Sequence, residues 1–145
     1  MVESHGKIID IWCNLFTERG RELYFDSQAQ TVAADIFNNE EMYAPEKGMT
    51  PEEIIGLMDR EGIDKVLIPA LKFGDPDGGM QIDVPHDLVA EVAAEYPDRI
   101  KGMAGINPRE GMDGVERLAE YVEDYGFVAA LLEPYGWDRP LNHRT

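Results

Sequence analysis

Strand-like and helix-like segments alternate along most of this chain, and the alternation restricts the fold more than any other feature of the sequence. Four short apolar runs have the composition of buried strands, and they lie at residues 7–16, 64–69, 101–106 and 127–132. Three segments with helical spacing of apolar residues lie between them, at residues 50–61, 85–96 and 111–125. Successive units of this kind predict an α/β fold with a parallel sheet and right-handed crossovers.

The predicted helices carry recognisable end signals. Thr50, Pro51 and Glu53 form a capping box with proline in the first turn. Gly62 and Gly126 are placed to end the first and third helices. The stripes expected to face the sheet are Ile54, Leu57 and Met58, then Leu88, Val89, Val92 and Ala93, then Val115, Leu118, Ala119 and Val122.

The first apolar run, KIIDIWCNLF at residues 7–16, reads as the first strand of the sheet. Because side chains alternate along a strand, Ile9, Ile11 and Cys13 would share one face and pack against helices. The other face would carry Asp10, Trp12 and Asn14 toward a barrel interior or the mouth of an active site. Cys13 lies in mid-strand, and we interpret it as a small buried core residue.

The same run resembles the opening of the amidohydrolase-related (amidohydrolase 2) proteins, in which two apolar residues precede Asp-x-His-x-His. Trp12 and Asn14 stand where that pattern has its two histidines. Further similar stretches are residues 57–66, LMDREGIDKV, residues 96–105, YPDRIKGMAG, and residues 125–128, YGFV, leading to Pro134. The resemblance therefore covers essentially the whole chain and departs from the pattern at the predicted metal ligands.

The resemblance implies an eight-stranded (β/α) barrel with its catalytic groups at the carboxyl ends of the strands. Such barrels need roughly 250 residues, whereas this chain has 145. It resembles the first four β/α units, a TIM-barrel-type N-terminal half spanning residues 1–145 as one domain. We expect two such halves, or this half and a missing second one, to complete a barrel, because a half-barrel leaves both edge strands and one flank open.

Two functions stay open at this point. The resemblance implies a metal-dependent hydrolase or nonoxidative decarboxylase of a small carboxylated or cyclic substrate, inactive as this isolated chain. The alternative is a non-catalytic half-barrel that serves as a binding or assembly subunit. Four more β/α units in the reading frame downstream would favour the enzyme. Zinc or manganese is the cofactor that the resemblance implies for the family, and we predict none for this chain, because indole nitrogen is no metal ligand.

Five residues near predicted strand ends are the candidate substrate-binding groups, and they are Asp10, Trp12, Asn14, Asn107 and Glu133. Trp12 offers a flat apolar wall and Asn14 offers both a donor and an acceptor, which suits an aromatic or carboxylate-bearing ligand. Trp12 could equally fill the barrel interior, and Asn107 has the same two interpretations. The catalytic residues are not identified by the sequence.

Other polar residues carry less information. His5 and His86 stand outside any ligand spacing and are interpreted as surface or capping residues, and His143 lies in a polar tail. The segment at residues 72–79 reads as a solvated loop, because its Asp75 and Asp77 lack the rest of a calcium-binding pattern. Residues 17–49 form a long connection, either a lid or a surface excursion, with a short helix at residues 30–38.

The charge balance restricts the partners. The net charge of −16 repels phosphate backbones, so we predict no nucleic-acid binding. No apolar run approaches the roughly 18 residues of a membrane span, and the N-terminus lacks signal-peptide character, so we expect a cytoplasmic protein. The acidic excess fits either a high-salt cytoplasm or an ordinary acidic protein.

Overall fold

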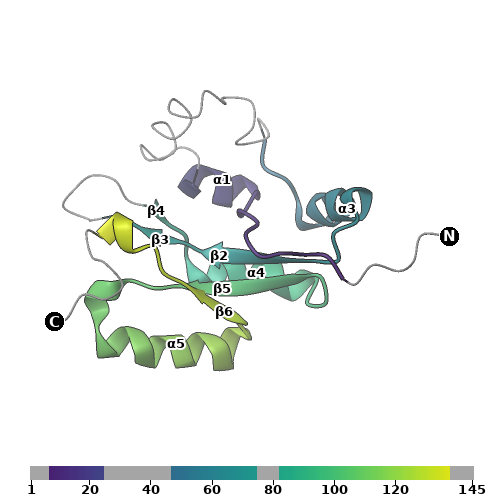
Figure 1. The fold of residues 1–145 in the computed structure, drawn as a ribbon. Coiled ribbons are helices and arrows are strands. Elements are labelled where there is room, and N and C mark those ends of the chain that lie inside the picture. Colours follow the sequence, from purple (N-terminus) through teal and green to yellow (C-terminus); the bar gives the residue numbers. More distant parts are fainter. Residues whose placement is uncertain (1–6, 25–46, 75–81, 138–145) are drawn as a thin grey trace.

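The computed structural model describes residues 7–24, 47–74 and 82–137. Four parallel strands form its main sheet in the order β1, β2, β5, β6 (Figure 1). Their bounds are Ile9–Asp10 for β1, Lys65–Ala70 for β2, Ile100–Gly105 for β5 and Ala129–Leu131 for β6. Spatial neighbours follow chain order, as in a (β/α) barrel, so the predicted half-barrel of four β/α units is confirmed.

Helices connect the strands and pack along the sheet (Figure 1). The three long ones are α3 (Pro51–Glu61), α4 (His86–Glu95) and α5 (Met112–Tyr125). The shorter ones are α1 (Glu18–Tyr24), η1 (Pro108–Glu110) and η2 (Pro134–Trp137). A small antiparallel pair, β3 (Lys72–Phe73) and β4 (Ile82–Asp83), follows β2. This pair corrects the predicted solvated loop at residues 72–79, since its first two residues are strand.

The predicted helix ends are present. The Thr50 hydroxyl accepts a hydrogen bond from the Glu53 backbone at 3.2 Å, and the Glu53 carboxylate accepts one from the Thr50 backbone at 2.7 Å. This reciprocal capping box satisfies two backbone donors that the helix itself leaves unpaired. Gly62 and Gly126 end α3 and α5 in the left-handed conformation, with φ of 73° and 65°, which costs glycine little.

The core lies between the sheet and its helices. Val66, Ile68 and Ala70 of β2 and Ile100 and Ala104 of β5 are buried in one cluster with the stripes of α3 and α4. Ile54, Met58, Val89, Val92 and Ala93 supply those stripes, as predicted, while Leu57 and Leu88 are half-buried. β5 also needs glycine at position 102, because a Cβ there would lie 2.2 Å from the Phe127 ring.

The first strand is shorter than predicted and its faces are reversed. Ile9 pairs with Lys65, and Asp10 pairs with the core residue Val66. Paired side chains share a face, so Ile9 does not pack against the helices and is 48% exposed, and Ile11 is 71% exposed. The strand ends at Asp10 because its carboxylate takes the backbone N–H of Trp12. Of the predicted helix-facing set, Cys13 alone is buried.

The apolar stripe of α5 was also predicted wrongly. Val115 and Val122 are 56% and 49% exposed, Ala119 is exposed, and Leu118 alone of the four packs against the core. The buried position near the start of the helix is Gly114 instead. The rest of the stripe faces away from the described core, and nothing among the described residues covers it.

Some predictions lie outside the described residues. These are the short helix at residues 30–38, the acidic loop residues Asp75 and Asp77, and the histidines His5 and His143. Of the long connection at residues 17–49, the structure describes α1 and the residues from 47 onward. A search of the described helices found none that is long and apolar enough to cross a membrane.

Candidate substrate-binding edge of the sheet

All five predicted site residues lie at or beyond the carboxyl ends of parallel strands. Asp10 ends β1, and Trp12 and Asn14 follow it. Asn107 comes directly before η1 after β5, and Glu133 comes between β6 and η2. Parallel strands present their carboxyl ends at one edge, which is where (β/α) folds bind ligands. We call this edge of the sheet the mouth.

Local hydrogen bonds hold the first three residues together. One oxygen of the Asp10 carboxylate accepts the Trp12 backbone N–H at 2.9 Å. The indole nitrogen of Trp12 donates to the side-chain oxygen of Asn14 at 3.1 Å. Trp12 remains 40% exposed, so the ring presents an accessible apolar surface beside two polar groups. Both interpretations of Trp12, as a binding wall and as filling of the barrel interior, stay predictions, because a four-stranded half-barrel exposes the side chains of its interior.

Asn107 and Glu133 are placed differently. The Asn107 side-chain oxygen accepts the Arg109 backbone N–H at 3.0 Å and caps η1, so that oxygen has a structural partner. Glu133 is buried, with 8% of its surface exposed. β2 and β5 separate β1 from β6, which corresponds to about 14 Å at the usual strand spacing. The sheet therefore does not bring Glu133 next to Trp12.

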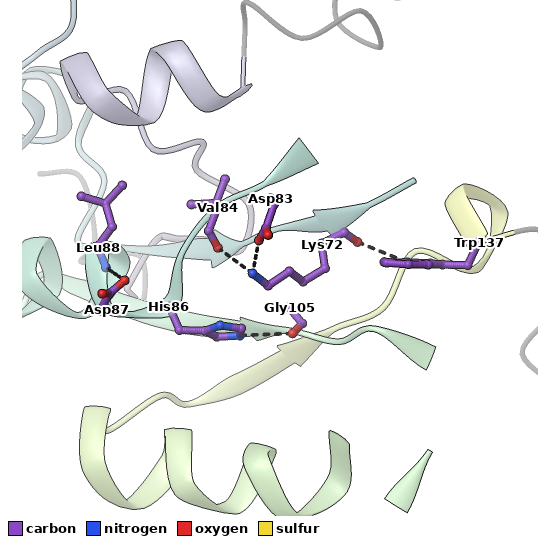
Figure 2. A network of polar contacts seen from close by, with 8 residues as sticks. All are labelled: Lys72, Asp83, Val84, His86, Asp87, Leu88, Gly105 and Trp137. Carbon is purple, nitrogen blue, oxygen red and sulfur yellow. Dashed lines mark hydrogen bonds and ion pairs between the residues drawn. The ribbon is translucent and has the colours of Figure 1, made fainter. Parts of the chain in front are cut away.

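A polar network at the centre of the mouth was missed by the sequence analysis (Figure 2). The Lys72 ammonium forms an ion pair with Asp83, and it donates to the Val84 carbonyl at 3.4 Å. The indole of Trp137 donates to the Lys72 carbonyl at 3.3 Å. Trp137 is buried at 3% exposure. The β3–β4 pair and η2 thus fix Lys72 directly beyond the end of β2.

His86 lies next to this network and is buried, which corrects its interpretation as a surface or capping residue. Its Nε2 lies 3.1 Å from the Gly105 carbonyl oxygen, so the neutral ring donates there (Figure 2). The ring stacks on Tyr121, with ring centroids 3.8 Å apart and planes 12° apart. Burial, and then the Lys72 charge, lower the pKa of His86 to about 4. The imidazole is therefore neutral near pH 7.

The missed residues did leave a sequence signal. Lys72 is the first charged residue after the apolar run at residues 66–71, and in a parallel sheet such a residue lies at the carboxyl edge. The aspartate and glycine residues that follow Lys72 favoured a loop, so Lys72 was assigned to that loop and not to the carboxyl edge. The pairing of Lys72 with Asp83 across β3 and β4 has no local signal, because eleven residues separate them.

The residues of the first strand do not fit a metal centre. Within the described ranges, no group of three or more His, Cys, Asp and Glu side chains lies close enough to hold an ion. Trp12 has no metal-binding nitrogen, and its indole already occupies the Asn14 oxygen. Cys13 is no better a ligand, since burial, and then the Asp10 charge, raise the pKa of its thiol to about 12. That this chain binds no metal stays a prediction.

Comparison with known proteins points to the fold. No family model matches the sequence, and no curated protein matches it. Among solved structures, 2,6-dihydroxybenzoate decarboxylase complexed with 2,6-dihydroxybenzoate is similar over 90% of this chain and 40% of its own, with a TM-score of 0.54 and 23% identity. 4-Oxalomesaconate hydratase from Rhodopseudomonas palustris is similar over 94% of this chain and 46% of its own, with a TM-score of 0.54 and 22% identity.

The chain has the fold of half a (β/α) barrel. It spans less than half the length of each of these two structures, which are barrel enzymes of the kind that the sequence resembles. The predicted resemblance to an amidohydrolase-related half-barrel is thereby confirmed at the level of the fold. Identities below one quarter carry no further conclusion about activity.

Proposed function

We propose that this chain is the N-terminal, substrate-binding half of an amidohydrolase-related hydrolase or nonoxidative decarboxylase acting on a small carboxylated or cyclic compound. The observation that carries the proposal is the match of its four parallel strands to part of two barrel enzymes. The names of both enzymes refer to carboxylated small molecules. The sequence motifs at residues 7–16, 57–66 and 96–105 independently point to the same group of proteins.

The chemistry of the mouth supports a flat, anionic ligand. Trp12 supplies an exposed aromatic surface, and Asn14 lies within hydrogen-bonding distance of it. Lys72 supplies positive charge near the ends of β2 and β5. Aromatic stacking with a cation opposite is a common way to bind an aromatic carboxylate. The role proposed for this half is therefore to bind and orient the substrate, because its own residues do not fit a metal site.

Tryptophan fluorescence tests this function on the 145-residue chain. The chain has two tryptophans, and the structure buries Trp137 while exposing Trp12. Titration with 2,6-dihydroxybenzoate should quench the emission along a saturation curve, and Trp12→Phe should remove most of the quenching. Trp137 remains in the variant as an internal reference. Quenching that never saturates, or that Trp12→Phe leaves intact, would contradict the proposal.

The second candidate function is assembly, and two exposed flanks favour it. Ile8, Ile9 and Ile11 lie at the β1 edge of the sheet, with 52%, 48% and 71% of their surfaces exposed. Val122 of α5 and Val128 next to β6 are 49% and 56% exposed at the opposite flank. Apolar groups in such numbers on two sheet flanks are typical of surfaces that another element covers. We propose a second copy of this chain as the occupant.

Two copies fit because each brings four parallel strands, and eight close a barrel of this type. The β6 flank of each copy would meet the β1 flank of the other around one two-fold axis. Light scattering at tens of micromolar should then give a dimer, and Val122→Glu should shift it toward the monomer. A monodisperse monomer of the unmodified chain would rule out the second copy as occupant.

A further inference from the structure

We propose that Lys72 forms a carboxylate-binding site at the ends of β2 and β5, where Asp83 holds the place of the ligand until a substrate carboxylate displaces it. The inference rests on the proposed function, since it names the group that recognises the negative charge of the substrate. Four observations on position, charge and exposure carry it.

The first observation is how Lys72 reaches this position. A Cβ on Gly105 would lie 1.8 Å from the Ala70 carbonyl oxygen and 3.0 Å from Cγ of Lys72. Glycine at the end of β5 therefore leaves room for the lysine stem beside it. The Trp137 indole binds the Lys72 carbonyl, which anchors the backbone while the side chain extends (Figure 2). A residue fixed in this way presents its ammonium at a defined place in the mouth.

The second observation is the unequal exposure of the ion pair. The Lys72 side chain is 20% exposed, whereas the Asp83 side chain is 54% exposed. A largely buried ammonium needs an acceptor nearby, because leaving it unpaired costs free energy. An exposed carboxylate, however, keeps much of its water, which limits what it gains from the ion pair. Displacement of the Asp83 side chain by a substrate carboxylate therefore costs little free energy, and the Lys72 ammonium has an acceptor both before and after the displacement.

The third observation is the charge of the surrounding groups. The predicted site residues on this edge are neutral or acidic: Asp10, Trp12, Asn14, Asn107 and Glu133. His86 contributes no charge at neutral pH, since its pKa lies at about 4. Lys72 is thus the positive group of the polar network at the mouth, where it can attract the charge of an anionic ligand.

The fourth observation distinguishes this site from the contacts of two other cationic side chains. The Lys65 ammonium donates to the Asp98 carbonyl at 2.6 Å, and Arg99 binds the Asp64 and Ile63 carbonyls. Arg99 also pairs with the exposed Asp59 carboxylate at 2.7 Å. All of these contacts, however, lie at the amino ends of the strands, away from the edge where (β/α) folds bind ligands. Lys72, by contrast, has an exchangeable carboxylate at the carboxyl edge.

Calorimetric titration of the 145-residue chain with 2,6-dihydroxybenzoate tests the site, with resorcinol as the same ring without the carboxylate. Lys72→Met should weaken binding of the carboxylate about tenfold or more, as expected for loss of a charged hydrogen bond. Lys72→Arg should keep most of the affinity. Lys65→Met is the matched control at the opposite end of the sheet and should bind like the unmodified chain. Resorcinol should show no dependence on Lys72.

Asp83→Asn separates displacement from a merely structural ion pair. If Asp83 competes with the ligand, removing its charge should tighten binding severalfold. If the pair only ties β3 to β4, the variant should bind more weakly or unchanged, which would overturn the proposal. Melting curves of all variants should first establish that each is folded. Equal affinities of Lys72→Met and Lys65→Met, or no saturable binding to the unmodified chain, would likewise overturn it.

The outcomes also separate this site from the proposed function. Binding that quenches Trp12 but does not depend on Lys72 would leave the proposed function standing and remove the Lys72 site. Binding that depends on Lys72 without any effect on Trp12 fluorescence would support the Lys72 site and contradict the proposed function, since the anion site would then be separate from the aromatic surface of Trp12.

Discussion

Nε of Arg99 donates a hydrogen bond to the carbonyl oxygen of Asp64 at 2.8 Å, across 35 residues of chain. The same guanidinium donates from Nη2 to the Ile63 carbonyl at 3.0 Å and to the Asp59 carboxylate at 2.7 Å. These contacts lie at the amino ends of β2 and β5, the face of a (β/α) barrel whose residues serve stability and not catalysis. Two of the stretches that carry the family resemblance, residues 57–66 and 96–105, are therefore joined by one side chain for structural reasons.

Replacing Arg99 should test that role. Arg99→Met should lower the free energy of unfolding by about 2 kcal/mol, because it leaves two backbone carbonyls without their charged donor. Arg99→Lys should cost less but should not restore full stability, since one ammonium cannot reproduce the fork of contacts. Arg60→Met is the control, because Arg60 makes only a loose surface pair with Glu61 at 3.7 Å. Chemical denaturation measures all three, and equal stability of Arg99→Met and Arg60→Met would contradict the prediction.

The net charge of −16 gives a prediction about salt. Repulsion between carboxylates is screened when the Debye length falls from about 30 Å at 0.01 M to about 3 Å at 1 M salt. The melting temperature should therefore rise with KCl between these concentrations. Differential scanning calorimetry can follow it, with sucrose at matched viscosity as the control. A flat or falling melting temperature would count against the interpretation as a high-salt protein.

Local sequence patterns predicted most of the fold. Two of the wrong predictions, the faces of β1 and the buried stripe of α5, depend on contacts between segments that are distant in sequence. α3 was predictable because Thr50, Pro51, Glu53 and Gly62 give it explicit ends. β1 was overextended because the apolar run at residues 7–16 hides the side-chain hydrogen bond by which Asp10 ends the strand. The α5 stripe was assigned to the core because periodicity shows that a helix has an apolar face, but not what covers that face.

For the candidate site, too, local patterns predicted the positions of residues but not the contacts between distant segments. The predicted strand ends placed Asp10, Trp12, Asn14, Asn107 and Glu133 at the carboxyl edge of the sheet, where the structure has them, and their role in binding stays a prediction. It could not show which residues lie close together, because strand order and register are not local properties. The network of Lys72, Asp83 and His86 depends on the β3–β4 pair and on the contact with Gly105, both of which join distant segments.

Cys13 should be chemically inert in the folded chain. The thiol is buried, and its pKa is raised to about 12, so almost no thiolate is present at pH 8. A thiol reagent such as dithionitrobenzoate should react slowly with the native chain and rapidly after denaturation in guanidinium. The single cysteine makes the signal unambiguous. Rapid reaction of the native chain would show that the β1 region opens readily.

The isolated chain should bind no stoichiometric zinc or manganese. Among the described residues, the segment that follows β1 offers Trp12 and Asn14 at the two ligand positions of the family pattern, and the indole donates to the Asn14 oxygen. Two copies closing a barrel would repeat the same residues and add no pair of histidines on this strand. Elemental analysis after dialysis should therefore find well below one metal equivalent per chain. One tightly held equivalent, lost in Asn14→Ala, would contradict this account.

His86 should make stability depend on pH in a definite direction. Its folded-state pKa of about 4 lies below the ordinary value of 6.5, chiefly because burial disfavours the charged ring. Between these two pH values the unfolded chain binds a proton that the folded chain does not, so stability is full above about pH 6.5 and falls as the pH drops toward about 4. The free energy of unfolding should fall by on the order of 2 kcal/mol over this range. Lys72 lowers the pKa of His86 further, whereas Asp83 and Asp87 oppose the shift.

His86→Phe isolates this contribution. The phenyl ring can keep the stack on Tyr121, which lies 3.8 Å away between ring centroids, but it cannot titrate or donate to Gly105. The variant should be less stable at pH 7, because the Gly105 carbonyl loses its donor. The stability difference between the unmodified chain and the variant should then shrink from pH 7 to pH 4.5. All other titrating groups are common to both chains and cancel in that difference. A difference that stays constant over this range, measured by urea denaturation at each pH, would show that His86 is not held neutral by burial.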